Sequence, residues 1–269
     1  MPKILSGKKI RDEKILILRE KVASLAFSPH LSIIQVGKNE ASEIYIREKK
    51  KFGESVGCIV EVINFPDNAR EEEIISKIES LNADKSIHGI MVQLPLPDGM
   101  DKEKVLKKIS PDKDVDGLSG MGKFVSATAR GVMEILDYYK IPMKGKKALV
   151  AGMSDLVGKP VAKLLADRGA MVSSVWEKSE NWENLAKEAD ILVSAVGKPG
   201  LVKKEMVKEG VVVVDIGISK TSEGKISGDV DFENVSLVAS AITPVPGGVG
   251  PMTVLALFEN LIESAEKKI

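Results

Sequence analysis

The sequence predicts an α/β protein with two domains, each built around a parallel sheet. Short apolar runs that end at glycine or proline alternate with longer segments whose apolar residues recur every three to four positions. This alternation is typical of parallel sheets covered by connecting helices. The run VVVVDIGI at 211–218 is branched almost throughout, as central strands buried on both faces are.

The composition indicates a soluble globular protein. The chain has 269 residues, of which 43% are apolar and 29% charged. Lys+Arg and Asp+Glu each number 39 and aromatic residues reach only 4%, so neither nucleic acid nor a membrane is an expected partner. No run has the length of a signal peptide or a membrane span, and Cys58 is the only cysteine. We therefore expect a cytoplasmic protein.

The first part of the chain predicts one parallel sheet. An amphipathic helix is expected over residues 10–25 and strands over 31–36, 58–64 and 87–94. Helices are expected over 41–52 and 71–81, and a short helix over 102–109 precedes a loop rich in Asp, Gly and Pro at 110–120. Residues 1–120 are therefore predicted to be the first domain.

The second part predicts a second sheet. After a helix over 128–139, strands are expected over 148–151, 171–175, 191–196, 211–218 and 235–239, with helical pieces at 182–189 and 206–209. The loop SAITPVPGGVGPMTV is constrained by proline and glycine. Residues 121–249 are predicted to be the second domain. The last helix, within 250–269, is amphipathic and is expected to return to the first domain, where it can bury its apolar face.

Residues 147–177 read as strand, tight turn, helix and strand. Gly152 ends the first strand, Ser154 is a possible helix cap, and Gly158 follows six residues after Gly152. A glycine turn that leads into a helix N-terminus can bind a pyrophosphate, so a Rossmann-type dinucleotide site is predicted. The spacing is G-x-S-x-x-x-G, which leaves a plain βαβ crossover as the alternative. Glu177 ends the second strand; it could accept from ribose hydroxyls and repel a ribose phosphate, or be a surface acid.

Two polar side chains in the first part are candidates for chemistry. Lys49 lies four residues after Tyr45, so both fall on one helix face. A lysine there could be an acid or base whose pKa burial lowers; the alternative is a solvated lysine in the run 49–51. Gln93 ends a buried strand, where parallel sheets bind ligands; the alternative is a strand-end glutamine with its own hydrogen bonds.

Asp116 in DKDVDG is a third candidate. Its carboxylate could accept two parallel N–H bonds from an amidine-like edge such as that of a pterin, or it could serve the turn. His30 and His88 are isolated and are interpreted as structural. No His, Cys or Asp cluster has metal-ligand spacing, so no metal is expected.

Together these motifs resemble the bifunctional methylenetetrahydrofolate dehydrogenase/cyclohydrolase family along almost the full chain. The resemblance lies in VGKNEASEIYIREKKKFGESVG, GIMVQLPLP, PDKDVDG, VAGMSDLVGKP, ADILVSAVGKPG, VVVVDIGI, GDVDFENV and ITPVPGGVGPMTV. It implies a homodimer that binds tetrahydrofolate derivatives in a cleft between its two α/β domains. It further implies oxidation of 5,10-methylenetetrahydrofolate with NADP or NAD and hydrolysis of the methenyl product to 10-formyltetrahydrofolate, without a metal.

The resemblance also implies site residues. Lys49, Tyr45 and Gln93 would be catalytic. The substrate would contact Tyr45, Asp116, Pro246, Gly247 and Gly248, and the nucleotide would contact Gly152, Met153, Ser154, Glu177, Ser179 and Ile218.

Three departures from the family pattern bear on these expectations. Residues 126–129 read SATA where the family often has Pro-Cys-Thr-Pro, Met153 stands where it often has arginine, and Trp176–Glu177 replaces a polar pair. The last two remove phosphate partners and add a negative charge, so we expect NAD to serve at least as well as NADP. The alternatives are an enzyme with dehydrogenase activity only and a non-catalytic folate- or dinucleotide-binding protein.

Overall fold

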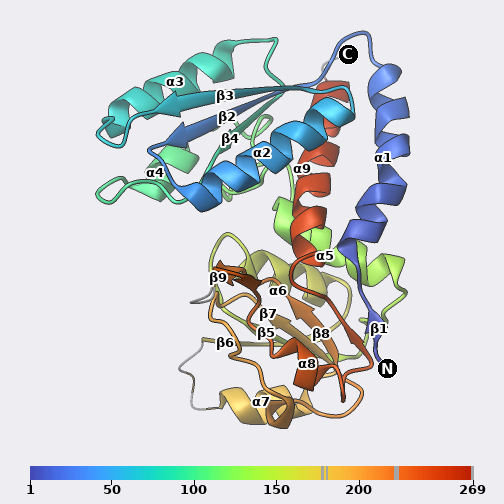
Figure 1. Cartoon of the computed structure of the whole chain (residues 1–269). Helices are drawn as coiled ribbons and strands as arrows, with labels where there is room; N and C mark the ends of the chain where they lie inside the picture. The colour runs from blue at the N-terminus through green and yellow to red at the C-terminus, as the bar shows by residue number, and fades with distance from the viewer. Residues whose placement is uncertain (177–178, 180, 221–223, 268–269) are drawn as a thin grey trace. The chain divides into compact units, whose positions relative to one another are not determined.

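The computed structural model describes residues 1–176, 179, 181–220 and 224–267 (Figure 1). The chain forms two compact units. The three-stranded unit comprises Glu13–Ala127 and Val254–Ile269, and the six-stranded unit comprises Met1–Asp12 and Thr128–Thr253. The boundaries fall inside helices α1 (Gly7–Ala23) and α9 (Val249–Glu266) and at the start of α5 (Ala127–Tyr138). No helix in the described part of the chain is long and apolar enough to cross a membrane.

The three-stranded unit holds a parallel sheet in the order β3-β2-β4. Helices α2 and α3 flank this sheet on opposite sides (Figure 1). The elements are β2 (His30–Val36), α2 (Glu40–Ser55), β3 (Ile59–Phe65), α3 (Glu71–Ala83), β4 (Gly89–Val92) and α4 (Lys102–Leu106). The chain passes from β2 to β3 on one side and then to β4 on the other. The carboxyl ends of β2 and β4 therefore form a topological switch point, where open α/β sheets bind ligands.

The six-stranded unit holds a parallel sheet in the order β1-β11-β8-β7-β5-β6. Its strands are β1 (Lys3–Ile4), β5 (Lys147–Ala151), β6 (Met171–Val175), β7 (Ile191–Ser194), β8 (Val212–Asp215) and β11 (Ala241–Ile242). The other elements are α6 (Gly158–Asp167), α7 (Trp182–Glu188), the 3-10 helix η1 (Lys204–Met206), the ribbon of β9 (Ser219–Lys220) and β10 (Ile226–Ser227), and α8 (Phe232–Val235). The predicted α/β class with two parallel sheets is confirmed, and the second sheet is Rossmann-like.

The predicted strand over residues 235–239 is wrong. Asp231 accepts a hydrogen bond from the Asn234 backbone N–H and caps α8, so Val235 ends a helix instead of starting a strand. The strand is β11, which begins at Ala241. Two residues of apolar sequence are too few to give a periodic signal, which also explains why β1 was not predicted.

The predicted domain boundaries differ from the compact units at the N-terminus. Strand β1 pairs with β11, so the first residues of the chain belong to the six-stranded unit and not to the unit that contains β2. The predicted domains were residues 1–120 together with 250–269, and residues 121–249. Whether each of them folds separately within these limits stays a prediction.

Candidate active site and nucleotide site

Lys49 is a buried amine that contacts the end of a strand. Its side chain lies on α2 and is only 8% exposed, so Lys49 is not a solvated surface lysine. Nζ donates a hydrogen bond of 3.0 Å to Oε1 of Gln93, the residue directly after β4. The Gln93 amide in turn donates to the carbonyl of Leu94 at 2.8 Å. Because Gln93 sits at the switch point of the sheet, the amine is held where a ligand would bind.

The first turn of α2 fixes this arrangement. Asn39 is the N-cap, and its Oδ1 accepts from the Ser42 backbone N–H at 3.0 Å. The buried Ser42 hydroxyl then donates to the Leu94 carbonyl at 3.3 Å. Ser42 on α2 and Gln93 at the strand end therefore donate to the same carbonyl oxygen. Sequence reasoning missed Ser42. The N-cap asparagine three residues before it was the available signal.

Asp116 lies in a segment that runs beside β4. The Ile90 N–H donates to the Lys113 carbonyl at 2.8 Å, which continues the sheet pairing into the loop. A Cβ at Gly89 would lie 2.7 Å from the Val115 side chain, so the close approach needs glycine. The half-buried Asp116 is then near enough to Lys49 for their charges to interact.

Burial dominates the protonation of this pair. Burial lowers the pKa of Lys49, and the charge of Asp116 partly opposes the change. Burial also raises the pKa of Asp116, while Lys49 lowers it and Asp114 raises it. Both shifts favour the neutral form of each group. Lys49 therefore has a neutral amine, which can accept a proton, at a lower pH than a free lysine does.

Tyr45 precedes Lys49 by one helical turn and is half-buried. Burial raises the pKa of its phenol, so the hydroxyl stays protonated. Because α2 spans both residues, Tyr45 and Lys49 lie on the same helix face, as their spacing predicted.

Asp114 organises the loop that carries Asp116. It is 1% exposed and accepts from the Ser119 N–H at 2.9 Å, the Ser119 hydroxyl at 2.6 Å and the Leu118 N–H at 3.2 Å. Sequence reasoning selected Asp116 as the candidate and did not identify the role of Asp114. The two acids differ in environment, because three donors surround Asp114 while Asp116 faces Lys49.

The predicted glycine turn lies at the switch point of the six-stranded unit. Gly152 follows β5 with φ of 88°, and a Cβ there would lie 2.3 Å from the carbonyl oxygen of Ala195, which follows β7. A Cβ at Gly158 would lie 1.8 Å from the Gly152 carbonyl oxygen. Both close approaches need glycine. The chain leaves β5 for β6 on one side and returns to β7 on the other, so these residues mark the expected ligand crevice.

The start of α6 suits an anion. Its N-cap is Val157, which offers no side-chain hydrogen bond, and Pro160 has no N–H, so the first turn keeps the Gly158 N–H as a donor for a ligand. The predicted capping by Ser154 is wrong: its side chain is exposed, and its carbonyl accepts from the Lys159 N–H at 3.0 Å. Half-buried Met153 sits between the turn glycine and this serine. The uncapped helix start and the tight turn fit a dinucleotide pyrophosphate.

The remaining predicted nucleotide residues lie around the same strand ends. Ile218 follows β8 and is 43% exposed. The Ser179 hydroxyl accepts from the Trp176 N–H, directly after β6, at 3.0 Å. Glu177 lies outside the described residues.

The loop of Pro246, Gly247 and Gly248 packs against the start of α1. The Lys8 N–H donates to the Gly247 carbonyl at 3.0 Å, and a Cβ at Gly7 would lie 2.0 Å from the Gly248 carbonyl oxygen. Pro246 is exposed. These three residues belong to the six-stranded unit, whereas Tyr45, Lys49, Gln93 and Asp116 belong to the three-stranded unit.

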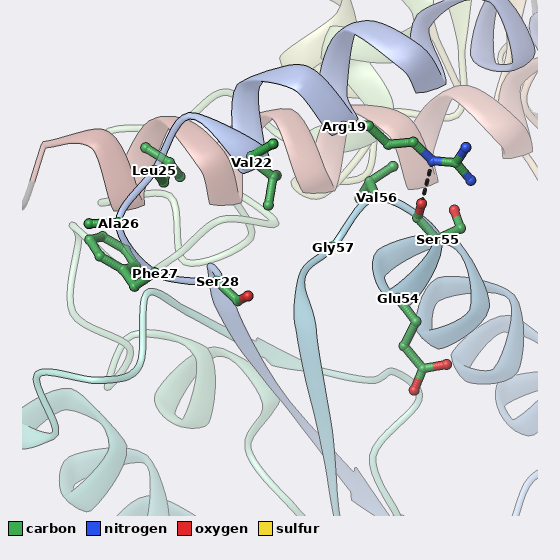
Figure 2. Close-up of a pocket in the computed structure, with 11 residues that line it drawn as sticks. Arg19, Val22, Leu25, Ala26, Phe27, Ser28, Glu54, Ser55, Val56 and Gly57 are labelled. Atoms are coloured by element: carbon green, nitrogen blue, oxygen red, sulfur yellow. Dashed lines mark hydrogen bonds between the residues drawn. The ribbon is translucent and has the colours of Figure 1, made fainter.

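A separate surface cavity of about 580 Å³ lies between the end of α1 and the turn from α2 to β3 (Figure 2). Arg19 lines it and donates to the Ser55 carbonyl at 2.6 Å. Phe27 lines it and stacks on His88 with ring centroids 4.8 Å apart. None of the predicted site residues lines this cavity.

Family models match both parts of the chain. Residues 5–116 match the family "Tetrahydrofolate dehydrogenase/cyclohydrolase, catalytic domain", and residues 126–269 match its "NAD(P)-binding domain". The chain is 44% identical to "Bifunctional protein FolD" of Staphylococcus aureus (strain bovine RF122 / ET3-1), over 97% of this chain and 95% of that protein.

Two solved structures are similar along the whole chain. The bifunctional FolD enzyme of Campylobacter jejuni superposes with a TM-score of 0.97 at 40% identity and covers 100% of both chains. FolD of Trypanosoma brucei, solved with NADP cofactor and an inhibitor, superposes with a TM-score of 0.95 at 34% identity and covers 100% of this chain and 99% of its own. The chain therefore belongs to the tetrahydrofolate dehydrogenase/cyclohydrolase family and carries both the catalytic domain and the NAD(P)-binding domain of that family.

Proposed function

We propose that this enzyme oxidises 5,10-methylenetetrahydrofolate to 5,10-methenyltetrahydrofolate with NAD(P)+ and hydrolyses that product to 10-formyltetrahydrofolate. The observation that carries the proposal is the buried Lys49 amine held by Gln93 at the switch point of the catalytic-domain sheet. Such an amine is a proton acceptor and donor positioned for chemistry that needs no metal.

Lys49 serves the hydrolytic step. Water adds to the cationic methenyl carbon, and the Lys49 amine accepts a proton from that water. The bond from this carbon to N5 then breaks, and Lys49 returns a proton to N5 while the carbon becomes the formyl group. One water proton ends on N5 and the other leaves to solvent. Gln93 orients Nζ throughout, because its neutral amide oxygen fixes the amine and favours the ammonium form less than a carboxylate would.

Asp116 and Tyr45 hold the pterin. Among the described residues none donates a hydrogen bond to the Asp116 carboxylate, so both of its oxygens are available to the amino-pyrimidinone edge. The Tyr45 ring, one turn before Lys49, supplies an aromatic face beside the reacting carbon. Pro246, Gly247 and Gly248 are proposed to contact substrate as in the family pattern.

The Gly152 turn, Met153, Ser154, Ser179 and Ile218 are proposed to bind the nucleotide, with Glu177 at the ribose. A bound nicotinamide supplies the hydride acceptor. The uncapped start of α6 offers the Gly158 N–H to the pyrophosphate.

NAD is proposed to serve at least as well as NADP. Met153 offers no charge to a ribose phosphate, and Glu177 would repel one. The relative from Trypanosoma brucei was solved with NADP. The ratio of kcat/KM values for NAD+ and NADP+ decides between the two, and a hundredfold preference for NADP+ would refute the proposal.

We also propose a cytoplasmic homodimer. Strand β3 pairs with β2 alone within the described chain and leaves one edge open, and its Ile59 is 49% exposed. An open, partly apolar edge strand is a surface that a second copy can cover. Light scattering after gel filtration should give twice the mass of one 29.0 kDa chain, and Ile59→Lys should shift the protein towards that single-chain mass. The single thiol, Cys58, is free and buried, which suits a reducing compartment.

One assay tests the main proposal. Methylenetetrahydrofolate is mixed with each nucleotide and the methenyl absorbance is followed over time. A rise followed by decay is expected from the two activities in sequence. A rise that stays stable would reduce the function to a dehydrogenase, and no rise with ligand bound would leave a binding protein.

A further inference from the structure

Two buried carboxylates lie at the carboxyl edge of the six-stranded sheet, outside every predicted site. Asp215 ends β8 and is 3% exposed, and Asp229 follows β10 and is 0% exposed. Neither forms an ion pair with a residue that the structure describes. A buried carboxylate without a cation must be stabilised by hydrogen-bond donors, so the identity of those donors shows what each acid holds in place.

Asp229 binds the segment that follows β7. Its Oδ2 accepts from the Ser194 hydroxyl at 2.7 Å and the Val196 N–H at 2.8 Å, and its Oδ1 accepts from the Lys198 N–H at 2.8 Å. Both oxygens are therefore used. An asparagine could not replace this carboxylate, because its NH2 group would face one of the three donors.

Asp215 binds the backbone that carries Asp229. Its Oδ1 accepts from the N–H groups of Gly217 at 2.9 Å and Asp229 at 3.1 Å, and its Oδ2 accepts from the Val230 N–H at 2.9 Å. A Cβ at Gly228 would lie 2.0 Å from Asp215 Oδ2. The close approach of backbone and carboxylate therefore depends on glycine at this position.

The segment that Asp229 holds touches the glycine turn. The Ala195 carbonyl oxygen is the atom that a Cβ at Gly152 would approach to 2.3 Å. Two residues later, the Gly197 carbonyl accepts from the Ser219 hydroxyl at 2.9 Å, next to Ile218. Asp215 and Asp229 thus connect the ends of β7 and β8 to the turn after β5, where the dinucleotide is expected.

We propose that Asp229, itself held by Asp215, is a positioning residue of the NAD(P) site that sets the backbone of residues 195–198 against the Gly152 turn. It acts through that backbone and does not touch the nucleotide. The inference rests on the NAD(P)-binding domain and the proposed dehydrogenase step, and not on the roles of Lys49 and Gln93.

The test compares Asp229→Asn with Asp231→Asn. Asp231 lies two residues further along, and its carboxylate accepts from the Asn234 N–H at 3.4 Å at the start of α8, so the control removes the same charge without touching residues 194–198. For Asp229→Asn we expect the KM for NAD(P)+ to rise at least about tenfold. Hydrolysis of added methenyltetrahydrofolate, which consumes no nucleotide, should stay within about twofold of the wild type. The control should leave both measurements within about twofold.

Ser194→Ala is the milder second variant, because it removes one of three donors to Asp229 and should raise the nucleotide KM about two- to fivefold. If Asp229→Asn folds and its KM for NAD(P)+ is unchanged, the inference is overturned. If Asp229→Asn does not fold, an unchanged KM for NAD(P)+ in Ser194→Ala overturns it. An equal loss of both activities also overturns it, since that is the result of a merely structural role. If the wild type hydrolyses no methenyl substrate, it is the proposed function that fails. The role of Asp229 is then tested by the rise in Tm that NAD(P)+ causes. A positioning role predicts a smaller rise in Asp229→Asn than in the wild type.

Discussion

The Lys49 amine and the Gln93 amide oxygen lie 3.0 Å apart, and this hydrogen bond joins α2 to the end of β4. The partner is neutral, which matters for the chemistry. A carboxylate at the same place would stabilise the ammonium form, whereas an amide orients the nitrogen and leaves burial free to lower the pKa of Lys49. Asp116 supplies the only opposing charge among the causes of that shift.

Lys49→Met should abolish methenyl hydrolysis without unfolding the protein. The lost acid–base function is expected to reduce the hydrolysis rate by about 10²–10⁴-fold. The Tm should stay the same or rise, because an apolar side chain of similar length replaces a buried amine. Lys50→Met is the matched control, since Lys50 is an exposed neighbour 3.9 Å from Glu54. Full cyclohydrolase turnover in Lys49→Met would remove Lys49 from the mechanism.

Gln93→Glu should move the pH dependence of hydrolysis. A carboxylate beside Nζ favours the ammonium form and raises the pKa of Lys49, so the neutral amine appears only at higher pH. The rising limb of the hydrolysis rate against pH should therefore shift to higher pH than in the wild type. Rates measured from pH 6 to 10 check this. A profile superimposable on the wild type would mean that Lys49 is not the titrating base.

The sequence alone predicted the elements that bury an apolar face over many residues. The final helix, expected within 250–269, is α9, and the strand expected over 191–196 is β7. The resemblance to the family named both Lys49 and Gln93 as catalytic, whereas their spacing in the sequence does not show that the two side chains meet in a hydrogen bond. Very short elements such as β1 and β11 could not be predicted, since two residues are too few to show the alternation of a strand.

The buried acids of the six-stranded unit were missed for a different reason. An aspartate after an apolar strand reads as the start of a loop, and nothing local shows that it turns inward to bind distant N–H groups. Asp229 contacts residues more than thirty positions away, at Ser194 and Val196. The available signal was glycine close to each acid, at Gly217 and Gly228, where side chains would collide with the carboxylates.

Gly152→Ala should impair nucleotide binding much more than Gly145→Ala. Both glycines have positive φ, 88° and 74°, so both variants incur backbone strain of about 1–2 kcal/mol. Only Gly152 is also crowded: its new Cβ would lie 2.3 Å from the Ala195 carbonyl oxygen, whereas nothing lies within 4 Å at Gly145.

The measurement is the dissociation constant for NAD(P)+ together with the Tm of each variant. Gly152→Ala should weaken nucleotide binding at least about tenfold while methenyl hydrolysis survives, and Gly145→Ala should lower only the Tm. Equal effects of the two substitutions on nucleotide affinity would show that the close approach at Gly152 does not shape the site.

Asp215→Asn should change how stability depends on pH. Burial raises the pKa of Asp215 to about 6 in the folded protein, against 3.8 as its ordinary value. Between these values the folded state binds more protons than the unfolded state, so the free energy of unfolding falls as pH rises from 4 towards 7. The full change from this group is at most about 3 kcal/mol. The variant cannot titrate at this position and should lack that part of the slope.

Urea denaturation at pH 4, 5, 6 and 7 checks this prediction. The two tryptophans of the chain, Trp176 and Trp182, both lie in the six-stranded unit, so their fluorescence reports the unit that contains Asp215. The free energy of unfolding of the wild type minus that of Asp215→Asn should decrease steadily as pH rises. A constant difference would mean that Asp215 stays ionised across this range, and that its three N–H donors outweigh the cost of burying its charge.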